Sequence, residues 1–204
     1  MHIADNDIDV YMYDPFCNGL DFSKYNLNNG QDFKNNVDYY RKKLHFFKIG
    51  ITGSNKKHNM KTLQEILNDN GHSNEKNMIL KMDVEYAEWE ALSEISEDIL
   101  KKFIYIVIEF HLWKNPDKTT FNVLKKLSKF HQVIFFRFNN GGNLVEFGYN
   151  KMCNAIEVTY MLKEGNEFVR DNSIYPLKEI NFMNFKERPS IDFDLNIFKL
   201  FYEK

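Results

Sequence analysis

The sequence predicts an α/β fold in which helices cover a largely parallel sheet. Short apolar runs rich in β-branched and aromatic residues alternate along the chain with amphipathic runs, as expected when strands and helices follow one another. Two of the apolar runs, 78–82 and 104–108, end at acidic residues. Because the carboxyl ends of strands form the ligand-binding edge of such a sheet, we expect the functional residues to lie there.

Size and composition predict one globular domain over 1–204, with a core over about 8–162 and a tail over 163–204. Of the 204 residues, 43% are hydrophobic, which is enough to bury a substantial core. The net charge is −2, lysines are dispersed, and Cys17 and Cys153 are the only cysteines. No apolar run approaches the roughly 20 residues of a membrane span. We therefore expect a cytoplasmic protein that binds neither nucleic acid nor membrane.

In the first half of the chain, the first predicted strand ends at Asp14. Pro15 follows it, and proline can continue neither a helix nor a strand ladder at that point. Gly71 is expected to stop a later helix. The elements predicted here are a strand over 8–13, a helix over about 32–43, a strand over 45–51 and a helix around 62–67.

In the second half, apolar spacing in the segment 119–129 predicts a helix whose inward side chains are Phe121, Leu124 and Leu127. Two closing strands are expected to be joined by a turn at 139–143, a run of asparagine and glycine. The remaining predicted elements are a strand over 78–82, a helix over about 87–102, a strand over 104–108 and the closing strands 131–136 and 155–162.

Ionisable residues follow both central strands. Asp83 and Glu85 come after 78–82 and share one face if the strand persists. Glu109 and His111 repeat that spacing after 104–108. Three carboxylates and an imidazole at one edge would suit either a general base or a hard metal. No short metal motif is present, so no metal is assigned; the alternatives are a helix N-terminal acid at Asp83 and a surface histidine at His111.

The run Leu-Lys-Met-Asp-Val-Glu-Tyr-Ala-Glu-Trp at 80–89 resembles the LKIDVEGAEW signature of FkbM-type S-adenosylmethionine-dependent methyltransferases. The resemblance covers about 10–160 of the chain. It implies a Rossmann-like class I sheet, mostly parallel with an antiparallel last strand, that binds S-adenosylmethionine at the strand tips. The implied reaction is O-methylation of a sugar or another small molecule, often in glycan biosynthesis. Further matching segments, in family order, are 10–14, 45–50, 106–111, 139–140 and 156–160.

The resemblance implies roles for the polar residues at the strand tips. Asp14 would accept hydrogen bonds from both ribose hydroxyls of the cofactor, since a carboxylate offers two acceptors; the alternative is a turn-forming aspartate before proline. Asn139 and Asn140 would orient a polar substrate, although an Asn-Asn-Gly-Gly turn also accounts for them. Near the transferred methyl group would lie Asp83, Glu85, Glu109 and His111, with Asp83 also facing the cofactor.

Three features depart from the family pattern. Nothing before Val10 matches the strand and glycine-rich turn with which such enzymes begin, so we expect an N-terminally short chain that lacks the first strand. Tyr86 stands where the family has glycine. Arg137 and Phe138 stand where the family often has His-Gly before the asparagine pair, which would remove a base or ligand.

These departures support a second hypothesis. The chain would then be a catalytically inactive, truncated methyltransferase-like protein that acts as a binding or structural module. A missing strand would leave a sheet edge unpaired, and such edges favour association with another chain. We therefore expect a homo-oligomer formed through that edge.

Overall fold

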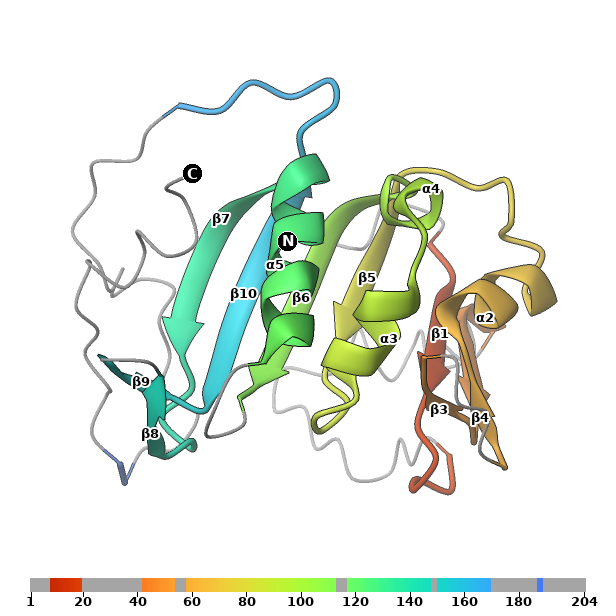
Figure 1. Ribbon diagram of the computed structural model, residues 1–204. Coiled ribbons are helices and arrows are strands. Elements are labelled where there is room, and N and C mark those ends of the chain that lie inside the picture. Colours follow the sequence, from red (N-terminus) through yellow and green to blue (C-terminus); the bar gives the residue numbers. More distant parts are fainter. Residues whose placement is uncertain are drawn as a thin grey trace, which may run out of the picture.

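A four-stranded sheet is the centre of the fold (Figure 1). The computed structural model describes residues 8–19, 42–53, 58–112, 117–147, 150–169 and 187–188. The strand order in the sheet is β5-β6-β10-β7, where the strands are β5 (Met78–Met82), β6 (Phe103–His111), β10 (Ala155–Leu162) and β7 (His131–Phe138). β5 runs parallel to β6, and β10 is antiparallel to both β6 and β7. The predicted mixed α/β fold with a mostly parallel sheet is confirmed.

Three helices, α3 (Glu88–Glu94), α4 (Glu97–Leu100) and α5 (Lys118–Phe130), lie in front of this sheet in Figure 1. The predicted single helix over 87–102 is wrong. Ile95 has extended backbone angles between α3 and α4, and the Ser96 hydroxyl accepts a hydrogen bond from the Ile99 amide. A serine that caps a new helix competes with continuation of the old one, which explains the break.

α5 confirms the predicted helix but turns a different face inward. Val123 and Leu127 are each 1% exposed, whereas Phe121 is 55% exposed. Leu124 is partly buried against the core. The buried stripe therefore runs at i, i+3 and i+7 from Thr120, and the prediction that Phe121 faces inward is wrong.

A lysine side chain of α5 binds the C-terminal end of α3. Lys126 Nζ donates hydrogen bonds to the carbonyl oxygens of Leu92, Ser93 and Ile95 at 3.1, 2.6 and 2.9 Å. The last carbonyls of a helix have no partner within the helix. Lys126 of α5 therefore supplies the C-terminal cap that α3 lacks in its own sequence.

The N-terminal half contributes two short parallel pairs. β1 (Val10–Tyr13) pairs with β2 (Leu44–Phe47), and β3 (Gly50–Ile51) pairs with β4 (Met60–Lys61). The predicted strand over 45–51 is wrong, because a tight Ile49 amide to Phe47 carbonyl hydrogen bond of 2.8 Å separates β2 from β3. The helix predicted over about 32–43 lies almost wholly outside the described residues.

α2 (Leu63–Asp69) follows β4, as predicted. Thr62 and Glu65 form a reciprocal capping box at its start, and Gly71, with φ of 74°, follows its end. Gly53, two residues after β3, packs closely on α3. A Cβ atom at Gly53 would lie 2.8 Å from the carbonyl oxygen of Glu90 in α3, so this contact admits no side chain.

An unpredicted hairpin separates β7 from β10. The predicted turn at 139–143 is present, with a hydrogen bond of 3.0 Å from the Gly142 amide to the Asn139 carbonyl. It leads into β8 (Leu144–Phe147) and β9 (Asn150–Cys153), which pair antiparallel, and not directly into β10.

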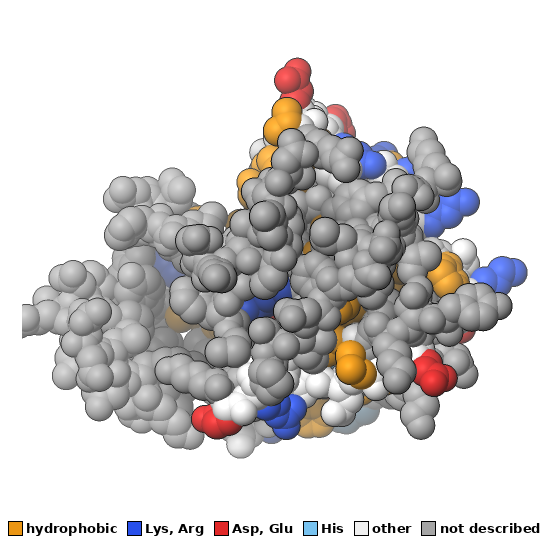
Figure 2. All heavy atoms as spheres, turned by 90° about the vertical axis from the view of Figure 1, so that its left-hand side faces the viewer, with side chains coloured by type: hydrophobic (Ala, Val, Ile, Leu, Met, Phe, Trp, Pro, Cys, Tyr) orange, Lys and Arg blue, Asp and Glu red, His pale blue; other side chains and the backbone are white. Residues whose placement is uncertain are grey.

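The described surface mixes both charge signs. Figure 2 shows one side of the molecule, on which basic, acidic and hydrophobic side chains of the described residues lie interspersed. In the described part of the chain, no helix combines the length and the apolar character needed to cross a membrane.

Candidate functional site

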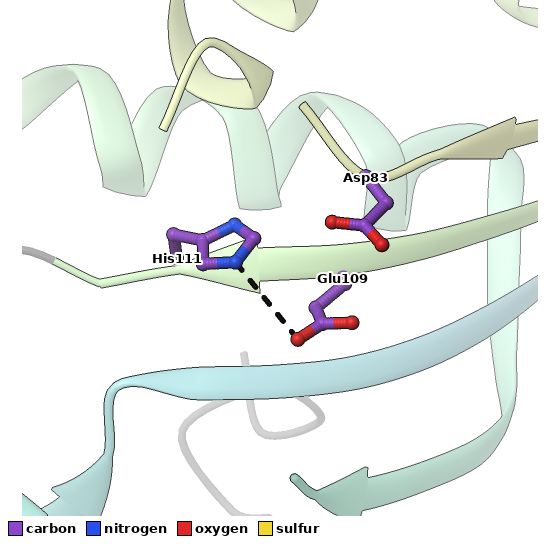
Figure 3. Close-up of side chains that lie close together, drawn as sticks. All are labelled: Asp83, Glu109 and His111. Carbon is purple, nitrogen blue, oxygen red and sulfur yellow. Dashed lines mark ion pairs between the residues drawn. The ribbon is translucent and has the colours of Figure 1, made fainter. Parts of the chain in front are cut away.

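The polar residues predicted at the ends of β5 and β6 meet at one edge of the sheet. Asp83 directly follows β5, while Glu109 and His111 are among the last three residues of β6. Met82 is in register with Ile108, so Asp83 lies beside Glu109. One ligand atom from each of Asp83, Glu109 and His111 lies within 4.8 Å of the others (Figure 3). We call these three residues the cluster.

A strained turn connects the cluster to α3. The Ala87 amide donates to the Val84 carbonyl at 3.2 Å, and the residues between them, Glu85 and Tyr86, have φ of 48° and 76°. Positive φ at both central residues is the pattern of a type I′ turn and is unfavourable for residues other than glycine. β5 therefore ends at Met82, so the condition under which Asp83 and Glu85 would share one strand face is not met. Glu85 reaches the site through the turn.

His111 lies among three glutamates. Its Nδ1 is 2.6 Å from Glu88 Oε1, and its Nε2 is 3.5 Å from Glu85 Oε2 and 3.8 Å from Glu109 Oε1. The hydrogen bond to Glu88 raises the pKa of His111, more than burial lowers it. Since Glu88 is the hydrogen-bonded partner of Nδ1, we assign the Nδ1 proton as the one donated to Glu88. Nε2 then faces Glu85, Glu109 and the rest of the cluster.

Glu88 is the functional residue that the sequence reasoning missed. It is the first residue of α3, its side chain is fully buried, and its Oε2 has no hydrogen-bond partner among the described residues. A signal was present in the sequence, because Glu88 shares a helical face with the apolar residues Ala91 and Leu92, at i+3 and i+4. A carboxylate on an apolar face is expensive unless it has a partner, and here the partner is His111.

Glu109 is positioned by an asparagine. Its side chain is 15% exposed, and its Oε1 accepts a hydrogen bond from Asn139 Nδ2 at 2.8 Å. Burial raises the pKa of Glu109, and the charge of Asp83 raises it further. The structure therefore brings Asn139 to the cluster. The described hydrogen bond of Asn140 joins its Nδ2 to the Arg188 carbonyl at 3.1 Å, and its role toward a substrate stays a prediction.

Comparison with known proteins decides the family. The model of the family described as the methyltransferase FkbM domain matches residues 9–143, which is more than half of the chain. The chain belongs to the FkbM methyltransferase family. No curated protein matches it significantly, and neither does any solved structure. The matched region of the chain includes β1, the whole cluster, Glu88 and both asparagines.

In this member of the family, Tyr86 replaces the glycine of the family signature at a position where glycine would be favoured. Tyr86 has φ of 76°, in the left-handed region. Its ring lies 5.2 Å from the His111 ring, centroid to centroid, with a tilt of 57°. The tyrosine therefore adds an aromatic wall beside the imidazole, at the cost of backbone strain.

Arg137 stands where the family often has histidine, and it is bound to a neighbouring strand. Its Nε and Nη2 atoms donate to the two carboxylate oxygens of Glu157, each at 2.7 Å. Glu157 on β10 is in register with both Arg137 on β7 and Glu109 on β6. The charge of Glu157 adds to the raised pKa of Glu109. Arg137 partly compensates that charge, which is a different role from that of a base or ligand.

Asp14 follows β1, as predicted, and its described contacts are local. Its Oδ1 accepts hydrogen bonds from the amides of Phe16 and Cys17 at 2.7 and 3.0 Å. Hydrogen bonding to Cys17 is the main reason that the pKa of Asp14 is lowered. The turn-forming role is therefore present, and no described contact joins Asp14 to the cluster. Its role toward a cofactor stays a prediction.

Negative charge dominates the site. Four carboxylates, those of Asp83, Glu85, Glu88 and Glu109, lie within or beside a cluster that contains one imidazole. Such a site attracts cations, and its imidazole can hold or accept a proton. The arrangement suits proton removal from a hydroxyl, and it offers oxygen and nitrogen ligands to a metal ion.

Proposed function

We propose that this chain is an S-adenosylmethionine-dependent methyltransferase that transfers a methyl group to a hydroxyl of a sugar or another small molecule. The observation that carries the proposal is the cluster at the carboxyl edge of the sheet in a chain of the FkbM methyltransferase family. Ligands of open α/β sheets bind at this edge. The family match does not favour the alternative of a catalytically inactive binding module.

We infer that the sheet is a Rossmann-like class I methyltransferase sheet. The order β5-β6-β10-β7 supports this, because a single reversed strand, β10, lies between β6 and β7, which run in the same direction. Such a sheet presents the ends of β5 and β6 to one ligand crevice.

The charge of the site fits S-adenosylmethionine. This cofactor supplies a methyl group on a positively charged sulfonium, and the acidic residues around His111 favour a positive charge nearby. Hydrogen bonding to Cys17 lowers the pKa of Asp14, which favours its ionised form, and the amides of Phe16 and Cys17 bind its Oδ1. Its carboxylate would hold the ribose hydroxyls, and Asp83 would lie on the side of the transferred methyl group.

The cluster would prepare the acceptor oxygen. As the bond from this oxygen to the methyl carbon forms, the bond from that carbon to sulfur breaks, and the hydroxyl proton must leave. Asn139 holds Glu109, and Glu88 holds His111 through Nδ1, so both groups would face the acceptor in fixed orientations. A hydroxyl loses its proton either to a base or to water after a cation lowers its pKa. Asn139 would also orient a polar acceptor.

Calorimetric titration and methyl transfer test this function. We expect S-adenosylmethionine to bind in wild-type protein, and the Asp14→Asn variant to bind it about tenfold more weakly, since a neutral amide replaces a charged acceptor. Glu94→Gln, which removes one exposed carboxylate at the end of α3, is the matched control and should bind like wild type. Transfer of labelled methyl groups to a panel of neutral sugars and small alcohols would identify the acceptor class. Absence of cofactor binding at millimolar concentration would refute the proposal and leave the binding-module hypothesis.

A further inference from the structure

We propose that Asp83, Glu109 and His111 bind a divalent transition-metal cation, and that Glu88 is the residue that positions the histidine ligand. The three potential ligand atoms already lie within 4.8 Å of one another. Atoms that share a cation lie about 2.1 Å from it and about 3 to 4 Å from each other. The side chains therefore need to draw together by roughly 1 Å, which rotation of Asp83 allows, because its side chain is 44% exposed.

His111 is the observation that distinguishes this site from an ordinary group of surface acids. Its side chain is only 10% exposed, and its Nε2 points into the cluster. The nearest carboxylate oxygens, on Glu85 and Glu109, lie 3.5 and 3.8 Å from Nε2, longer than a normal hydrogen bond. A buried imidazole nitrogen that faces acidic groups and has no short partner among the described residues has the geometry of a metal ligand before the metal binds.

Glu88 supplies the outer contact that metal-binding histidines require. Histidine ligands donate their other ring N–H to a carboxylate or carbonyl, which fixes the tautomer and orients the ring. The 2.6 Å contact from His111 Nδ1 to the fully buried Glu88 Oε1 is such an arrangement. Trp89 Nε1 also donates to the His111 carbonyl at 2.7 Å, so the backbone of this residue is held as well.

The charge balance also favours a cation. Four carboxylates lie around the imidazole, those of Asp83, Glu85, Glu88 and Glu109. Among the described ion pairs of these carboxylates, the one with a lysine is a loose contact of 3.7 Å between Lys81 Nζ and Asp83 Oδ2. Lys81 is 57% exposed, so solvent screens its charge. A divalent cation between the carboxylates would offset their mutual repulsion in a partly buried site.

The mixed ligand set selects the class of metal. Carboxylates suit Mg²⁺, Ca²⁺ and Mn²⁺, whereas imidazole suits transition metals. Two carboxylates and one imidazole therefore favour Mn²⁺ or a similar cation over Mg²⁺ and Ca²⁺. The role of the cation in catalysis rests on the function proposed above: it would hold the acceptor hydroxyl, lower the pKa of that hydroxyl, and let the proton pass to water.

Mn²⁺ binding to the full chain tests the site without cofactor or acceptor. Titration followed by electron paramagnetic resonance should give one tight site, and the spin-echo signal should carry modulation from a directly bound imidazole nitrogen. We expect Asp83→Asn to weaken binding at least tenfold and His111→Gln to abolish the nitrogen modulation. Glu94→Gln removes an equal charge from an exposed position on α3 and should leave both readouts unchanged.

Glu88→Gln tests the positioning role. The glutamine keeps the shape of the side chain, and loss of an outer-shell carboxylate typically weakens metal binding 10- to 100-fold. Circular dichroism of each variant would establish that the fold is retained. If a buried substitution prevents folding, Asp83→Asn, at a half-exposed position, still tests whether the cluster binds the metal.

Two results would overturn the proposal: weak Mn²⁺ binding that all variants share, or tight binding without nitrogen modulation. Either result would leave cofactor binding untouched, since that is measured separately. Conversely, Mn²⁺ binding in a chain that does not bind S-adenosylmethionine would refute the proposed function and retain the metal site.

Discussion

Glu85 holds a backbone conformation that favours glycine, and its Oε2 lies 3.5 Å from His111 Nε2. Its φ is 48° and its side chain is 78% exposed, so few packing contacts offset the strain. Glu85→Gly should stabilise the protein by about 0.5 to 1 kcal/mol, because the left-handed conformation costs about 1 to 2 kcal/mol and the added chain entropy of glycine takes back part of the gain. Urea unfolding would measure the change.

Glu85→Ala is the control for that prediction. It removes the same carboxylate and keeps the backbone strain, so it should not be stabilised. Both variants should lose methyl transfer if the carboxylate acts on the acceptor, which would be a trade of stability for function at one residue. Equal stability of the alanine and glycine variants would contradict the idea that the turn is strained.

His131 should make stability depend on pH. It is 1% exposed, its Nε2 lies 2.9 Å from the Phe103 carbonyl, and its Nδ1 has no hydrogen-bond partner among the described residues. Burial lowers the pKa of His131 below its ordinary value of 6.5. As the pH falls below about 6.5, His131 takes up a proton more readily in the unfolded chain than in the native state. The stability that comes from keeping this side chain neutral is therefore present above about pH 6.5 and is lost as the pH falls.

Comparison with His131→Gln isolates the effect, because the amide can still donate to Phe103 but does not titrate. Below about pH 6.5 the wild type should lose stability relative to the variant with a slope of up to about 1.4 kcal/mol per pH unit. The raised pKa of His111 acts in the opposite direction, since its contribution is lost as the pH rises, but it is common to both proteins and cancels. Parallel stability curves for the two proteins would contradict the prediction.

Among the elements, α3 depends on a cap from α5. Lys126→Met should destabilise the protein by about 1 to 2 kcal/mol, because the three carbonyls at the end of α3 lose a charged donor. Lys125→Met, at the exposed neighbouring position, is the matched control and should change stability little. Thermal and urea unfolding would give both values, and an equal loss in the two variants would show that general charge, and not the cap, matters.

Elements with strong local patterns were predictable from the sequence, and those set by distant contacts were not. β5, α2, α5 and β10 follow their apolar periodicity and capping residues. The sequence analysis predicts one helix across Ile95, although the Ser96 hydroxyl caps the start of a second helix, α4. Two-residue strands such as β3 and β4 carry too little pattern to predict.

The same distinction holds for the candidate site. The cluster was predictable because parallel strand ends meet at one edge, so residues after β5 and at the end of β6 converge whatever their loops do. Glu88 was not assigned because its role depends on the angle at which α3 leaves the strained turn. The link from Asn139 to Glu109 likewise requires the register of β10 between β6 and β7.

At the level of the whole molecule, the edge of β5 that does not pair with β6 bears on self-association. Among the described strands, β5 pairs only with β6, and Ile79 on β5 is 54% exposed. We predict a concentration-dependent homo-oligomer that Ile79→Lys weakens, since lysine on an edge strand opposes pairing with a second chain. Sedimentation velocity would measure this, with Val169→Lys, at a 93% exposed position outside the strands, as the control. A wild-type monomer at every concentration would refute the expectation.

The contact of Gly53 with α3 has a consequence for how this protein can vary. Position 53 belongs to a segment outside the site, yet a methyl group there would push against the Glu90 carbonyl in the helix that begins with Glu88. Any larger residue must displace that helix, and with it the carboxylate that orients His111. Random mutagenesis selected for activity should therefore return glycine at position 53, and loss of function there would not mean that the residue touches a substrate.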